Sequence, residues 1–164
     1  NNAKVFFPLT ENWQNNAKVF FPLTENWHGY ASETVNCLAE GDYYRIDNIP
    51  FFIRGISLGD LVYAEYNENC FTYIRTVNKS GNSTYRVIFN NNGDLELNKN
   101  YLNSFLLSQD CDYEGFSRDR SLQAINIPPE ANIDAVYNFL AEGETNGRWE
   151  FEEGDYGRRG LMAN

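Results

Sequence analysis

Acidic side chains are the groups in this chain best suited to catalysis or ion binding, and several of them lie close together near its end. Glu150 and Glu152 alternate with Trp149 and Phe151, so in a strand the two carboxylates lie side by side on one face. Paired carboxylates can transfer protons when one of them sits in an apolar pocket, and they can hold a hard cation. Because aromatic residues occupy the opposite face, we expect both glutamates to face water.

A second acidic run, at 110–114, has the same spacing. We interpret both runs as solvated faces that can contact a basic partner. The candidate partner-binding residues are Glu150, Glu152, Glu153, Asp112 and Glu114.

Hydroxyl-bearing loops are the next candidates. Residues 55–59 contain a G-x-S-x-G pattern, which in hydrolases places a nucleophilic serine on a strand-to-helix turn. Here it lies between two expected strands with no histidine after it, so we interpret it as accidental and assign no catalytic residue.

A cleft between the two halves of the chain could instead hold a small ligand. Its candidate residues are Arg54, Asp60, Ser80 and Ser83.

Composition excludes several classes of function. The 164 residues include 23 acids and 13 bases, a net charge of −10, which opposes binding to the phosphates of nucleic acid. A single histidine and three cysteines without a CxxC pair predict neither a metal site nor a cofactor. No apolar run approaches the roughly 18 residues that span a membrane. These features favour a protein that is not an enzyme.

The cysteines also bear on the compartment. Cys37, Cys70 and Cys111 are odd in number and widely spaced, which is typical of free thiols in a reducing environment. The chain shows no basic segment followed by an apolar one at its start. We therefore expect a cytoplasmic protein.

An identical repeat opens the chain. Residues 1–13 and 15–27 both read NNAKVFFPLTENW, and nothing similar follows. We interpret residues 1–14 as a duplicated segment, either an artefact or an extra edge strand at 4–9 that could exchange between chains.

The remaining chain predicts an α+β protein in two halves. Residues 15–79 contain short aromatic and β-branched strands with tight turns, typical of a small β-barrel-like half. Residues 80–155 predict a ferredoxin-like β-α-β-β-α-β half, with helices at 95–108 and from Asn132 to Gly143. Residues 156–164 are expected to be a tail.

Five segments of the chain are similar to those of one bacterial family, the domain of unknown function 4265 family. They are YRIDNIPFF at 44–52, RGISLGD at 54–60, SGNSTYRV at 80–87, PPEAN at 128–132 and GRWEFEEG at 147–154. The resemblance covers about residues 17–155 and implies a cytoplasmic bacterial domain without a settled activity. Asn82 stands where the family often carries His, so a role that needs an imidazole there is absent.

Two functions from different classes fit these observations. The first is a small acidic binding protein, specifically an immunity protein that masks a basic, nuclease-type toxin, because acidic charge accelerates capture of a basic protein and aromatic residues anchor interfaces. The second is an enzyme or small-ligand sensor that uses the cleft between the two halves.

Overall fold

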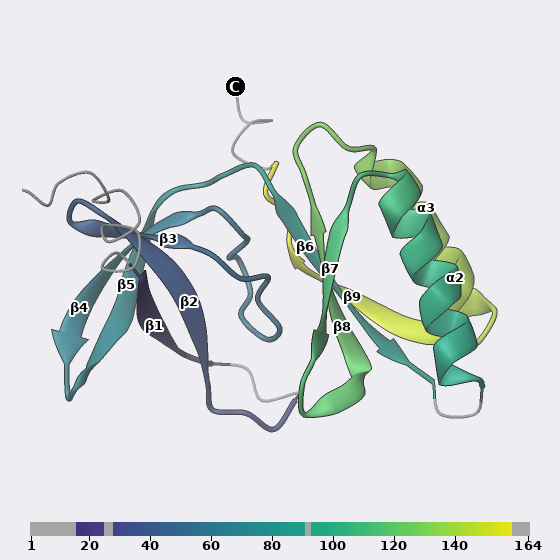
Figure 1. Cartoon of the computed structure of the whole chain (residues 1–164), viewed down its shortest axis with the longest axis horizontal. Coiled ribbons are helices and arrows are strands. Elements are labelled where there is room, and N and C mark those ends of the chain that lie inside the picture. Colours follow the sequence, from purple (N-terminus) through teal and green to yellow (C-terminus); the bar gives the residue numbers. More distant parts are fainter. Residues whose placement is uncertain (1–15, 25–27, 91–92, 159–164) are drawn as a thin grey trace, which may run out of the picture.

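The structure is a computed structural model that describes residues 16–24, 28–90 and 93–158 (Figure 1). The strand expected at 4–9, and most of the tail expected at 156–164, lie outside the described residues.

The first half is a sheet of five strands that pair in chain order. They are β1 (Asn16–Pro22), β2 (Ser32–Glu40), β3 (Tyr43–Ile46), β4 (Leu61–Asn67) and β5 (Cys70–Asn78). Consecutive strands are antiparallel, and β1 also pairs in parallel with β5 at Val19–Phe71 and Phe20–Thr72. The first and last strands of this sheet are therefore neighbours.

Alternation along these strands places one set of side chains inside. Val19 and Phe21 of β1 are 0% and 2% exposed, and they meet Val35 and Cys37 of β2 in one apolar cluster. The residue before Val19 is Lys18, which is exposed, as a side-chain period of two requires.

The second half is a four-stranded sheet with two helices. Its elements are β6 (Ser83–Phe89), α2 (Leu95–Ser108), β7 (Asp112–Phe116), β8 (Asp119–Ile127), α3 (Ile133–Thr145) and β9 (Trp149–Asp155). The strand order is β7-β8-β6-β9 and all neighbours are antiparallel. The protein is thus mostly β with two helices, which confirms the α+β class.

Both helices cover the same face of this sheet, and the other face is turned toward the first half (Figure 1). Each helix begins at a capping side chain: Asp94 accepts from the N–H groups of Glu96 and Leu97, and Asn132 accepts from that of Ala135. Beneath the helices lies a second apolar core, in which Trp149 is fully buried.

The residues directly after β9 are packed against the sheet. The N–H of Gly157 donates to Oγ of Ser83 at 3.0 Å, and Nη2 of Arg158 donates to the carbonyls of Pro128 and Ala131. Residues 156–158 thus extend the second half, within the segment expected as a tail. None of the described helices is long and apolar enough to cross a membrane.

Candidate functional site

The two halves meet through a polar junction. The N–H of Gly55, in the β3–β4 loop, donates to the carbonyl of Gly154 in β9 at 2.9 Å. Beside it, the hydroxyl of Ser57 donates to Oδ2 of Asp155 and shares a hydrogen bond with the hydroxyl of Thr84, both at 2.7 Å. Ser57, the serine of the G-x-S-x-G pattern, is fully buried. Its hydroxyl therefore joins the two halves.

Asp60 is the centre of the same junction. It is 0% exposed and accepts from the N–H groups of Ser57 and Ser80, each at 2.8 Å. Lys79 donates to Oδ2 of Asp60, to Oδ2 of Asp155 at 2.7 Å and to the carbonyl of Gly55 at 2.8 Å. One ammonium group thus neutralises carboxylates from both halves, as burial of charge requires.

The four residues expected in a ligand cleft do lie at this junction, but in internal contacts. Arg54 pairs with Glu152 at 2.9 Å, and the hydroxyl of Ser80 donates to the carbonyl of Leu58 at 2.7 Å. Ser83 is buried and accepts from Gly157, and Asp60 is buried as described above. Arg54 and, through Lys79, Asp60 connect the two halves, whereas the contact of Ser83 lies within the second half.

A buried guanidinium fixes the β3–β4 loop against the second sheet. Arg86 of β6 is 1% exposed, and its Nε donates to Oε2 of Glu152 at 2.9 Å. Its Nη1 donates to the carbonyls of Ile53 at 2.9 Å and Pro50 at 3.3 Å, and its Nη2 donates to that of Phe52 at 3.4 Å. Burial lowers the pKa of Arg86, and the facing Glu152 opposes that shift. The loop thus supplies the oxygen atoms that this buried cation needs.

Glu33 of β2 holds the other side of the same loop. Its carboxylate accepts from the N–H groups of Phe51 and Phe52 at 2.8 Å and from that of Ile53 at 3.1 Å. Three donors on one carboxylate fix the loop conformation, and with it the positions of the two phenylalanine rings.

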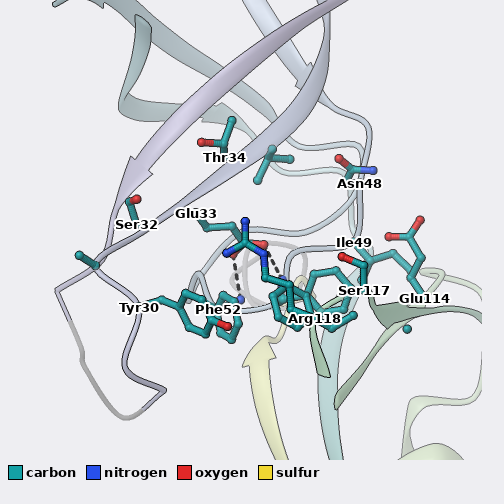
Figure 2. A pocket seen from close by; sticks show the side chains of 15 residues that line it. Tyr30, Ser32, Glu33, Thr34, Asn48, Ile49, Phe52, Glu114, Ser117 and Arg118 are labelled. Carbon is teal, nitrogen blue, oxygen red and sulfur yellow. Dashed lines mark hydrogen bonds between the residues drawn. The ribbon is translucent and has the colours of Figure 1, made fainter. Parts of the chain in front are cut away.

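A groove of about 550 Å³ opens where this loop meets the β7–β8 hairpin (Figure 2). β2 and the residues before it form one wall, the loop forms the floor, and Glu114 to Arg118 form the other wall. The side chains that define it are Tyr30, Ser32, Glu33, Thr34, Asn48, Phe51, Phe52, Glu114, Phe116, Ser117 and Arg118.

Four aromatic rings contribute to the apolar part of the groove. The ring of Phe52 stacks with that of Tyr30 at 4.6 Å and meets that of Phe116 edge-on at 5.3 Å. Phe51 lies 5.0 Å from Phe116. Rings from both halves thus form one surface, and such surfaces anchor bound side chains.

Two charged residues lie at the β7–β8 side of this surface. Burial raises the pKa of Glu114 above its ordinary value of 4.5. No residue in the described ranges forms a hydrogen bond or ion pair with this carboxylate. Arg118 extends from the β7–β8 turn over the groove and is exposed (Figure 2). The groove can therefore receive a cation at Glu114 or an anion at Arg118.

The predicted acidic residues do not form one patch. Glu114 and Asp112 lie on β7, and Glu150 lies exposed on β9, at the opposite edge of the sheet. Glu152, which we expected to face water, is bound by Arg86 and Arg54, and Glu153 accepts from the hydroxyl of Tyr85 at 3.1 Å.

Sequence reasoning missed the residues that build the groove, notably Glu33, Arg86 and Arg118. Glu33 and Arg86 bind groups that are distant in the chain, so no local pattern in the sequence indicated their roles. Across the described ranges, no three His, Cys, Asp or Glu side chains are grouped so that they could hold a metal ion.

The family model of the domain of unknown function 4265 matches residues 33–151. The chain belongs to this family. The match includes both walls of the groove from Glu33 onward, and the resemblance drawn from the sequence is confirmed. No curated protein matches the chain significantly.

The fold is also similar to that of a solved structure, titled a novel crystal structure of a hypothetical protein from Neisseria gonorrhoeae. The TM-score is 0.75 at 17% sequence identity, over 87% of this chain and 96% of that one. At this identity the likeness concerns the fold alone.

Proposed function

We propose that this member of the domain of unknown function 4265 family is a cytoplasmic binding protein for a basic protein. The specific form we favour is an immunity protein that masks a nuclease-type toxin. The observation that carries the proposal is Glu114, a solvent-exposed carboxylate in the groove wall without a cationic partner among the described residues, next to an aromatic surface. A lysine or arginine from a partner would supply the missing charge and stack on the rings.

The overall charge supports this proposal. A net charge of −10 attracts a basic protein and raises the rate of encounter, and the effect weakens as salt screens it. A nuclease must itself be basic where it holds phosphates, so it is a partner of suitable charge.

We also propose a specific fold for each of the two halves. We infer a small barrel for the first half, supported by the pairing of β1 with β5, and a ferredoxin-like unit for the second, supported by the order β7-β8-β6-β9. The groove then lies between two units, which is a common place for binding sites.

The experiment begins with capture of partners from the encoding bacterium on the tagged protein, followed by titration of the purified candidate. Glu114→Gln should weaken binding about tenfold or more, as expected for loss of a partly desolvated ion pair. The matched control is Glu142→Gln, which makes the same charge change on an exposed position of α3. Equal losses in the two variants would show that only net charge matters, and this would contradict a site at Glu114.

The proposed immunity role is tested by measuring whether the protein protects cells from the captured partner. Co-expression of the chain with the captured basic protein should restore growth that this protein alone prevents. A partner that is not toxic would refute the immunity role and leave the binding role standing.

The second candidate is a sensor or enzyme for a small anionic ligand, which the volume of the groove and the position of Arg118 favour. Arg118→Ala separates the two candidates. It should abolish a ligand-induced rise in melting temperature for an anionic ligand, whereas it should preserve or strengthen binding of a basic protein.

A further inference from the structure

The repeat at the start of the chain duplicates one complete strand of the fold. β1 is Asn16–Pro22, and the same seven residues occur at 2–8, outside the described part of the chain. We infer that the two copies are interchangeable occupants of a single position in the first sheet, so that the chain carries a spare β1. This inference does not depend on the proposed function.

The β1 position requires apolar side chains at its two buried sites, and the first copy has the same residues at the equivalent sites. Val19 faces Val35 in the antiparallel register with β2 and Phe71 in the parallel register with β5. The ring of Phe21 stacks on Tyr73 at 4.7 Å. In the first copy the equivalent positions are Val5 and Phe7, so the sequence repeats the residue types that make these contacts.

The connection to β2 decides which copy is preferred. Residues 23–31 join β1 to β2, whereas residues 9–31 would do so if the first copy were in place. The dependence of loop closure on length makes the longer connection about fourfold less favourable. This preference for the second copy is modest, so the first copy can replace it when the second is damaged.

The test places a charge in the buried position of each copy. Val19→Asp should lower the folding equilibrium constant of the full chain only about fivefold, because the first copy takes over. In a chain that lacks residues 1–14, the same substitution should lower it more than about a hundredfold, since a buried unpaired carboxylate has no replacement. Val5→Asp alone should change little, and Val5→Asp with Val19→Asp should behave like the substituted short chain. Urea unfolding measures all four.

Val35→Asp is the matched control. It places the same charge opposite Val19, at a residue that is 1% exposed and has no duplicate, so it should unfold the full chain. Equal destabilisation by Val19→Asp in the full and shortened chains would overturn the inference. Failure of the unsubstituted short chain to fold would overturn it too, because the second copy alone would then be insufficient. Size-exclusion chromatography with light scattering must show monomers, since rescue only in oligomers would mean that the strand comes from another chain.

Discussion

Nζ of Lys79 lies 2.7 Å from Oδ2 of Asp155, so the segment that leaves β5 is ion-paired to the end of β9. The same nitrogen also bonds Asp60 and the carbonyl of Gly55. A single side chain between the halves thus neutralises one carboxylate from each of them. The groove depends on this junction, because its walls come from different halves.

Replacing Lys79 should therefore destabilise the whole protein. Lys79→Met leaves Asp60, which is 0% exposed, and Asp155, which is 7% exposed, without their cation, and we expect a loss of about 3 kcal/mol in the free energy of unfolding. Urea unfolding measures the loss. Lys18→Met, at an exposed position of β1, is the control and should change stability by less than about 0.5 kcal/mol. Similar effects in the two variants would contradict a specific role of the junction.

Replacing Gly143 with alanine should lower the stability of the protein, although this substitution usually stabilises a helix. Glycine inside a helix is ordinarily improved by alanine, by about 1 kcal/mol. A Cβ at Gly143 of α3 would lie 2.0 Å from Cζ2 of Trp149, a buried ring whose Nε1 donates to the carbonyl of Leu140. We therefore expect Gly143→Ala to destabilise by about 2 kcal/mol in thermal or urea unfolding. Gly115→Ala, where no atom lies within 4 Å, should be nearly neutral, and a stabilised Gly143→Ala variant would contradict the packing of Trp149.

The three thiols should differ in reactivity. Burial raises the pKa of Cys37 to about 12 and that of Cys111 to about 11, and both side chains are buried. Because the thiolate is the reactive form, only Cys70 should react rapidly with a thiol reagent at pH 8, and all three should react in denaturant. Peptide mass spectrometry after brief labelling identifies the site. Rapid labelling of Cys37 in the native protein would contradict its burial in the apolar cluster of the first half.

The local elements could be predicted from the sequence because their signals are local. The helix expected at 95–108 has these bounds in the structure, and Asn132 caps α3 as expected. The groove could not be predicted, because it depends on contacts between distant segments. Glu33, for example, binds N–H groups of the β3–β4 loop, the first of which belongs to Phe51, 18 residues later.

Side-chain type alone did not reveal the internal contacts of the expected cleft residues. Asp60, Ser80 and Ser83 do meet at the junction of the two halves, yet their polar atoms are used within the protein. Their sequence neighbours gave no sign of this, because the atoms they bind belong to other segments. In the groove, Glu114 is the one predicted residue that keeps its carboxylate available among the described side chains.

Glu33→Gln tests how the groove is held open. The substitution keeps the shape of the side chain but replaces one of the two oxygens that accept from three backbone N–H groups. The new NH₂ group of glutamine would then face a backbone N–H, and neither can accept a hydrogen bond. We expect a loss of about 1–3 kcal/mol in stability and faster amide exchange at Phe51 and Phe52. Hydrogen exchange with residue resolution measures the latter. Unchanged protection at these amides would contradict the role of Glu33 in positioning the loop.

Glu114 should carry a small pH-dependent cost that can be measured without any partner. Burial raises its pKa in the folded protein, so the folded state favours the protonated form. Ionisation therefore lowers stability above the folded pKa, and this cost disappears as the pH falls through that value toward the unfolded one. Glu114→Gln should be more stable than the parent at pH 7, by less than about 1 kcal/mol because solvent screens an exposed group, and the difference should vanish in acid. Urea unfolding from pH 4 to pH 8, with Glu142→Gln as control, gives the difference. A parent that is more stable than Glu114→Gln at pH 7 would mean that this carboxylate already has a cationic partner, and the binding site would then have to lie elsewhere.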